Sequence, residues 1–86
     1  MLYRFSTHAL SEMIQRNIPR EKVEAVLANP EQVIPEQHGR SVYQSKVDFG
    51  TRKLFLLRVV VVDTTEPAIV ITVYRTSKLS KYWRTE

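Results

Sequence analysis

The chain has 86 residues, 43% of them hydrophobic, and a net charge of +4, which suits one folded domain with a modest core. It has no cysteine, so a disulfide framework and a thiolate metal site are excluded. No apolar run approaches the length of a membrane span, and the first ten residues lack the apolar core of a signal peptide. We therefore expect a single cytoplasmic domain over residues 1–86.

The first predicted element is a helix from about Thr7 to Arg16, because Ser6 is a good N-cap. Leu10, Met13 and Ile14 have the i, i+3, i+4 spacing of one apolar helix face. We expect these three side chains to pack inward.

A second helix is predicted to begin at Pro19, a residue that suits the start of a helix. Val23, Val26 and Leu27 form its apolar stripe, and the sequence ANP at residues 28–30 ends it, because the residue before a proline avoids the helical region. The connection between the two helices is short. The pattern therefore predicts a helical hairpin over residues 6–29.

The next stretch, residues 32–76, favours strands separated by turns. The third and fourth of these strands are apolar on both faces, which is typical of central strands. We predict an α+β domain, with the hairpin on one face of a mainly antiparallel sheet of three or four strands. The predicted strands are Gln32–Pro35, Ser41–Phe49, Leu54–Asp63 and Ala68–Thr76.

The last segment, residues 77–86, is a basic and aromatic tail. Its apolar side chains are Leu79, Tyr82 and Trp83, whose i, i+3, i+4 spacing predicts a short C-terminal helix that docks through one stripe. On this reading the tail is partly structural and partly a source of positive charge.

Positive charge is concentrated in the second half of the chain. Residues 1–39 carry four basic and five acidic side chains, whereas residues 40–86 carry nine basic and four acidic ones. Such asymmetry favours a polyanion or an acidic protein as partner, and a solvated basic face is the alternative.

Arg58 interrupts an otherwise apolar central strand. A charge at such a position is costly unless it is paired or faces a cleft. Two explanations therefore remain open: an ion pair with a carboxylate such as Glu12 or Glu24, or a role in binding and catalysis.

His8 and Tyr74 are the candidates for proton transfer. His8 lies in the first turn of the predicted first helix, where an imidazole can act as a base or help backbone N–H groups to bind phosphate. Tyr74 ends a buried strand, and a tyrosine hydroxyl can transfer a proton. The structural alternatives are a surface histidine and a tyrosine that caps the core.

Several cations complete the candidate site. Arg75 follows Tyr74 and can clamp a phosphate through two parallel hydrogen bonds. We group His8, Arg58, Tyr74 and Arg75 as candidate catalytic residues. The candidate substrate-binding residues are Arg16, Arg40, Lys46, Lys78, Lys81 and Arg84.

This combination suits ribonuclease action without a metal ion. A base removes the proton of an RNA 2′-hydroxyl, cations stabilise the doubly charged phosphorane, and an acid protonates the leaving 5′-oxygen. The sequence shows no metal-ligand spacing, no Gly-rich phosphate loop and no nucleophile elbow, so we expect neither a metal nor another cofactor.

The segments FSTHALSEMIQRNIPREKVEAVLANPEQVIPEQHGRSVYQ, LRVVVV and VITVYRT together resemble a family of small bacterial domains without an assigned function. That family looks like a relative of BrnT-type toxins and, more distantly, of RelE-like ribonuclease toxins of toxin–antitoxin pairs. The resemblance implies metal-independent RNA cleavage, possible contact with ribosome-bound mRNA, and neutralisation by an acidic antitoxin. The positions that match are His8, Arg16, Arg58 and Tyr74.

The leading hypothesis is therefore an endoribonuclease toxin that cleaves mRNA. Two hypotheses from other classes stay open, namely a non-catalytic nucleic-acid-binding module that uses the basic tail, and a protein-interaction domain that binds an acidic partner along a sheet edge. A homo-oligomer is left open as well.

Overall fold

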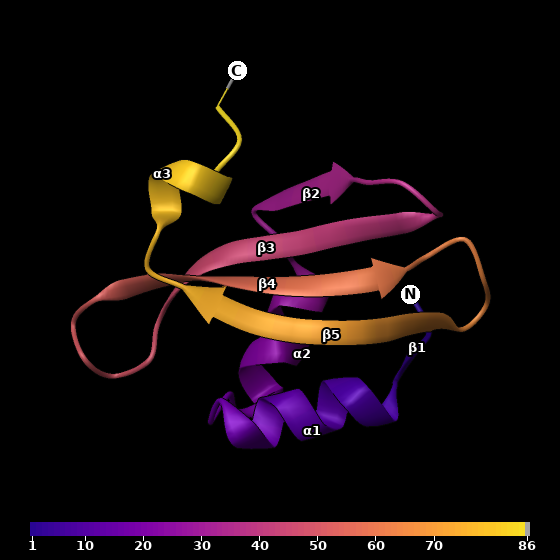
Figure 1. Ribbon diagram of the computed structural model, residues 1–86, viewed down its shortest axis with the longest axis horizontal. Coiled ribbons are helices and arrows are strands. Elements are labelled where there is room, and N and C mark those ends of the chain that lie inside the picture. The colour runs from indigo at the N-terminus through magenta and orange to yellow at the C-terminus, as the bar shows by residue number, and fades with distance from the viewer. Residues whose placement is uncertain (86) are drawn as a thin grey trace.

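The computed structural model describes residues 1–85, which form a sheet with two helices on one of its faces and a third, short helix near the C-terminus (Figure 1). No helix in this part of the chain has the length and apolarity that a membrane crossing requires. The elements in chain order are β1 (Tyr3–Phe5), α1 (Thr7–Gln15), α2 (Arg20–Ala28), β2 (Gln32–Pro35), β3 (Arg40–Asp48), β4 (Leu54–Val62), β5 (Ala68–Thr76) and α3 (Leu79–Tyr82).

The sheet has five strands in the order β1-β5-β4-β3-β2, so the predicted count of three or four strands is wrong. The additional strand, β1, pairs in parallel with β5, whereas the other neighbours are antiparallel, which makes the sheet mixed. β1 has only three residues, too few for a period-two pattern, and its partner lies more than sixty positions away in the chain. The α+β class and the four longer strands agree with the sequence prediction.

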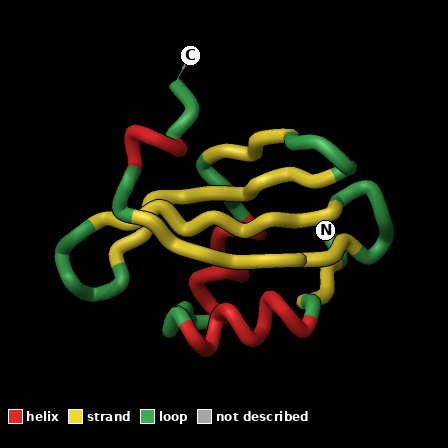
Figure 2. The backbone as a smooth tube through the Cα atoms, viewed as in Figure 1, coloured by secondary structure: helices red, strands yellow, loops and turns green. Residues whose placement is uncertain are grey.

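The two N-terminal helices do not form the predicted hairpin. α1 packs against β5, and α2 packs against β3 and β4, so each helix rests on the sheet and not along its neighbour (Figure 2). Asn17 has a left-handed conformation with φ 54°, and the next residue, Ile18, turns into the core. This abrupt turn sends the chain onto another part of the sheet.

The core lies between these helices and the sheet. Ala9 and Met13 of α1 face β5, so Leu10 and Ile14, each about 100° further round the helix, point outward. Their exposed fractions are 40% and 80%, and the prediction that both pack inward is wrong. The predicted stripe of α2 is confirmed. The buried cluster contains Val23, Val26 and Leu27 of α2 together with Leu57, Val59, Val61, Val70 and Val73 of the sheet.

The opposite face of the sheet carries no helix from residues 1–76; we call it the open face. Its side chains alternate along each strand with those that face the helices. Ile34, Val42 and Val60 form a small apolar cluster there. The tail, Ser77–Thr85 with α3, is the one segment in the described chain that lies over this face (Figure 1).

Candidate functional site

Four polar side chains form a straight row across the open face. Gln32 of β2 is paired with Gln44 of β3, Gln44 with Arg58 of β4, and Arg58 with Tyr74 of β5. Paired residues on adjacent strands point to the same side of a sheet and lie close enough to bond. The strand register therefore brings together four side chains that are scattered over more than forty residues of sequence.

Hydrogen bonds connect the row from end to end. Arg58 Nε donates to Gln44 Oε1 at 2.8 Å, and Arg58 Nη1 donates to the Tyr74 hydroxyl at 2.5 Å. Gln44 Nε2 in turn donates to Gln32 Oε1 at 2.7 Å. Since arginine can only donate, the bond from Nε requires the oxygen of Gln44 to face it, and this sets the orientation of both amides.

Arg58 is only 6% exposed, yet no carboxylate of residues 1–85 lies within 4 Å of its guanidinium. The predicted ion-pair explanation is therefore wrong for Glu12 and Glu24. These carboxylates lie on the two helices, where they pair with Arg16 at 3.0 Å and Arg20 at 3.2 Å. Arg58 is instead a buried cation that two neutral groups hold in place.

The tail covers one side of this cation. The Tyr82 ring lies 4.4 Å from the guanidinium carbon of Arg58, and the Tyr82 carbonyl accepts a hydrogen bond from Gln44 Nε2 at 3.2 Å. Gln32 bonds to both backbone groups of Arg84, accepting from its N–H at 3.1 Å and donating to its carbonyl at 2.5 Å. Lys46 Nζ lies 4.1 Å from the centre of the Trp83 ring. The predicted short helix exists, and none of its residues is buried. The tail as a whole therefore docks mainly through polar and cation–π contacts.

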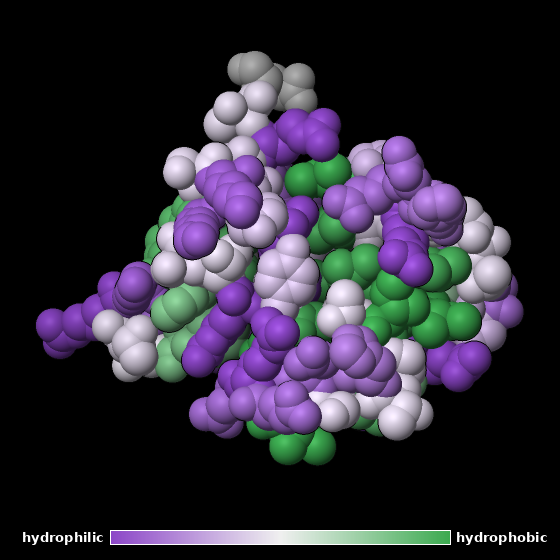
Figure 3. All heavy atoms as spheres, viewed as in Figure 1, coloured by the Kyte–Doolittle hydropathy of each residue, from purple (hydrophilic) through white to green (hydrophobic). Residues whose placement is uncertain are grey.

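A pocket of about 450 Å³ opens where the tail meets the sheet. Figure 3 views the open face and shows hydrophilic side chains around the tail beside an apolar area of the sheet. The pocket contains several cations and one carboxylate among its lining groups, so it suits an anion with some polar and apolar parts. It is lined by Ile34, Glu36, Arg58, Lys81, Tyr82, Trp83, Arg84 and Thr85.

The structure brings some of the predicted site residues together at this pocket. Arg58 and Tyr74 are in contact, and Lys81 and Arg84 line the pocket. Lys46 is on the same face of β3, two residues beyond Gln44, and its ammonium group lies over the Trp83 ring. Lys78 is exposed at the start of the tail, beyond the end of β5.

Arg40 belongs to the open face but lies four residues along β3 from Gln44, or about 13 Å at the rise of a strand. It lines a separate pocket with Glu36, Gln37 and His38. A contact between Arg40 and a group bound at Arg58 would therefore require an extended ligand.

The other predicted residues lie on the helix side. His8 and Arg16 share Glu12 on α1, with His8 Nε2 at 3.7 Å and Arg16 Nε at 3.0 Å from its carboxylate. Arg75 alternates with Tyr74 and so points to the opposite face of β5, where its guanidinium carbon lies 4.4 Å from the centre of the Phe49 ring. Neither His8 nor Arg75 shares a site with Arg58.

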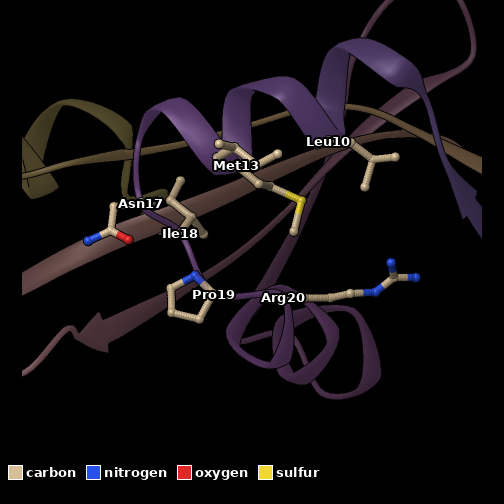
Figure 4. A pocket seen from close by; sticks show the side chains of 7 residues that line it. Leu10, Met13, Asn17, Ile18, Pro19 and Arg20 are labelled. Atoms are coloured by element: carbon tan, nitrogen blue, oxygen red, sulfur yellow. The ribbon is translucent and has the colours of Figure 1, made fainter.

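A groove of about 530 Å³ also lies on the helix side, between α1 and the start of α2. Figure 4 shows Met13 and Ile18 at its centre and Arg20 at its edge. Its lining is mostly apolar and contains one cation, so it offers little for binding phosphate. The open-face pocket is the better candidate site.

Sequence reasoning missed Gln32, Gln44 and Glu36. A glutamine in a strand is normally predicted to be exposed to solvent, but Gln44 is completely buried. A buried amide must find hydrogen-bond partners, so its burial would have been the signal. That burial follows from the tail and cannot be read from residues 41–49 alone.

The surroundings of Tyr43 shift the pKa of its hydroxyl. Burial raises its pKa, and the hydrogen bond to Asp63 at 3.0 Å raises it further. Tyr43 alternates with Gln44 and belongs to the helix side. Residues 1–85 contain no group of three or more His, Asp or Glu side chains placed to hold a metal ion.

Comparison with known proteins gives a family but no activity. No curated protein and no solved structure matches the chain. A family model described as a domain of unknown function, DUF4258, matches residues 5–75. The resemblance to a family without assigned function is thereby confirmed, while the link to BrnT-like and RelE-like toxins stays a prediction. The matched segment contains the whole Gln32–Tyr74 row and ends before the tail, and the chain belongs to the DUF4258 family.

Proposed function

We propose that this protein is a metal-independent endoribonuclease whose site is the open-face pocket. The observation that carries the proposal is the buried Arg58 guanidinium, which contacts the Tyr74 hydroxyl and has no carboxylate partner in residues 1–85. A buried cation without a counterion is costly, and a phosphate from a ligand would supply the missing negative charge.

Arg58 has donors to spare for such a phosphate. Two of the N–H groups of its guanidinium go to Gln44 and Tyr74, and the other three find no acceptor in the described chain. A guanidinium held in place before the reaction stabilises the charge of the phosphorane without having to reorganise. Lys81 and Arg84 add positive charge to the same pocket.

Tyr74 is suited to act as the general acid. Its oxygen accepts the hydrogen bond from Arg58, so its own O–H proton is free to be donated. The adjacent guanidinium also stands next to the oxygen that becomes negative when the proton leaves. Since His8 lies on the other side of the sheet, Glu36, the acidic group that lines the pocket, takes the role of base in this proposal.

The reaction then runs in one displacement. Glu36 accepts the proton of the 2′-hydroxyl while the 2′-oxygen bonds to phosphorus. The bond from phosphorus to the 5′-oxygen breaks, and that oxygen takes the proton of Tyr74. The products are a 2′,3′-cyclic phosphate and a free 5′-hydroxyl.

The tail favours a single-stranded substrate. Tyr82 and Trp83 place aromatic rings beside Lys81 and Arg84 at the edge of the pocket. Alternating cations and aromatic rings bind the backbone and the unpaired bases of single strands. An acidic protein that covers the same surface would inhibit the site. Such a protein is the partner that the toxin hypothesis requires.

Cleavage of single-stranded RNA in the presence of a chelator tests this proposal. We expect cyclic-phosphate ends, no cleavage of a DNA strand of the same sequence, and a loss on the order of 100-fold or more for Arg58→Ala. Arg75→Ala is the matched control, since it removes the same charge from the opposite face of the neighbouring strand.

The outcomes separate the competing functions. RNA binding that depends on Arg58 without any cleavage would replace the ribonuclease proposal with the non-catalytic binding module. Equal cleavage by folded Arg58→Ala and by the parent protein would contradict the assignment of the site.

A further inference from the structure

Gln44 stands at the centre of the site and makes three side-chain hydrogen bonds there. It is 0% exposed; its oxygen accepts from Arg58 Nε, and its nitrogen donates to Gln32 Oε1 and to the Tyr82 carbonyl. An arginine side chain has no acceptor atom, and the Tyr82 carbonyl has no donor. The oxygen and nitrogen of the Gln44 amide therefore cannot exchange places without losing all three bonds. A single buried side chain therefore connects the cation to the tail.

The choice of an amide at this position has an electrostatic consequence. A glutamate of nearly the same shape could accept the same bond from Arg58, but it would neutralise the guanidinium within the protein. Gln44, the Tyr74 hydroxyl and the faces of the Tyr74 and Tyr82 rings instead stabilise the cation through dipoles and π electrons. The full charge of Arg58 remains available to a ligand.

We propose that Gln44 is a positioning residue that holds the Arg58 guanidinium and keeps its charge uncompensated, so that Arg58 can bind a phosphate group. The inference rests on the proposed function for the identity of the ligand, a phosphodiester. It also covers simple phosphate, because the binding of any such anion depends on the same free charge.

Two substitutions separate the charge effect from the contacts of the amide. Gln44→Glu supplies an internal counterion and also loses the two bonds that the amide nitrogen donates. Gln44→Met loses the same two bonds and the acceptor for Arg58, but it adds no charge. If Gln44 served only to tie down the tail, both variants would behave alike.

The experiment measures binding of inorganic phosphate and of a short single-stranded 2′-O-methyl RNA, which cannot be cleaved through its 2′-oxygen. Trp83, the single tryptophan of the chain, lies in the pocket wall and reports binding through its fluorescence. Affinities over a salt series give the number of phosphate contacts from the slope, at about 0.7 per contact for a single strand.

We expect Gln44→Glu to bind both probes at least tenfold more weakly and to lose the slope of one contact. Gln44→Met should bind the RNA more weakly than the parent, yet more tightly than Gln44→Glu, and should keep the parental slope. Gln32→Glu is the matched control, because it adds the same charge to the same row but two strand spacings from Arg58, or about 9.6 Å, where Gln44 is one spacing away. Its affinity should fall less than that of Gln44→Glu.

A parental slope and affinity in folded Gln44→Glu would overturn the inference, and so would identical behaviour of Gln44→Glu and Gln44→Met. Parental affinity in Gln44→Met would show that the amide does not position Arg58, and would overturn it even if Gln44→Glu failed to fold. Expected binding effects with no RNA cleavage by the parent would support Gln44 while rejecting the ribonuclease. RNA cleavage by the parent with unaltered binding by Gln44→Glu would do the reverse. A parent that binds neither probe would overturn the inference.

Discussion

The two faces of the sheet hold the same type of side chain in different ways. Arg58 on the open face is buried and bonded to Gln44 and Tyr74, whereas Arg75 on the helix side is half-buried and stacks on Phe49 and Phe55. The stacked arginine completes the packing around a hairpin. The bonded arginine has a fixed guanidinium, spare donors and a pocket beside it. Hydrogen-bond geometry, and not charge alone, therefore distinguishes the candidate site.

Arrest of bacterial growth should be the strongest consequence of an active open-face pocket. We expect induced expression of the protein to stop growth, because cleavage of mRNA halts protein synthesis. Arg58→Ala should abolish the arrest and Arg75→Ala should retain it, measured as colony formation after induction. Normal growth with soluble parent protein accumulating would count against the toxin hypothesis.

Removal of the Tyr74 hydroxyl should give the next largest effect. Tyr74→Phe keeps the ring beside Arg58 but deletes the proton donor, so the rate of RNA cleavage should fall by roughly 100- to 10,000-fold. Binding of an uncleavable RNA should change much less. Tyr43→Phe, which removes a hydroxyl from the helix side, is the control and should cleave at the parental rate. A fully active Tyr74→Phe variant would assign the acid to another group.

The tail cations should show a smaller, graded effect on binding. Lys81→Ala with Arg84→Ala should reduce the salt dependence of RNA binding by about 0.7 for each lost phosphate contact. Arg16→Ala with Arg20→Ala removes the same charge from the helix side and should leave the slope unchanged. A parental slope in the tail variant would mean that these cations do not touch RNA, and a pull-down with an acidic protein would then test them as a docking surface.

The weakest effect should be on the stability of the folded protein at alkaline pH. It arises from Tyr43, whose side chain lies on the helix side of the sheet. Burial and Asp63 raise the pKa of Tyr43 in the folded protein, so the folded state holds this proton more tightly than the unfolded chain. The resulting stability is present below about pH 10, the unfolded value, and is lost as the pH rises through the folded pKa. In Tyr43→Phe this alkaline loss should be smaller, as measured by denaturant unfolding between neutral and alkaline pH. An unchanged pH dependence would show that other groups cause the loss.

Sequence patterns predicted the parts of the fold that local chemistry decides. Ser6 caps α1 by accepting from the Ala9 N–H at 3.0 Å, and the apolar stripe of α2 is buried as its spacing predicts. The four longer strands follow from alternating or continuous apolar runs that are long enough to read. β1 was not predicted, because three residues are too few to show alternation and the strand is stabilised by a partner that is distant in the chain.

Three features can be predicted from local sequence patterns alone: the α+β class, the excess of cations in the second half, and the unusual position of Arg58 inside an apolar strand. Which side chains share a site depends instead on how the strands pair in the folded chain. Strand alternation separates Tyr74 from Arg75, although they are neighbours in the chain, and strand register joins Gln32, Gln44, Arg58 and Tyr74 across four strands. Both effects arise from pairing between distant segments. A local pattern cannot reveal them, because the face that a side chain occupies is fixed by the partner strand and the core that the sheet covers.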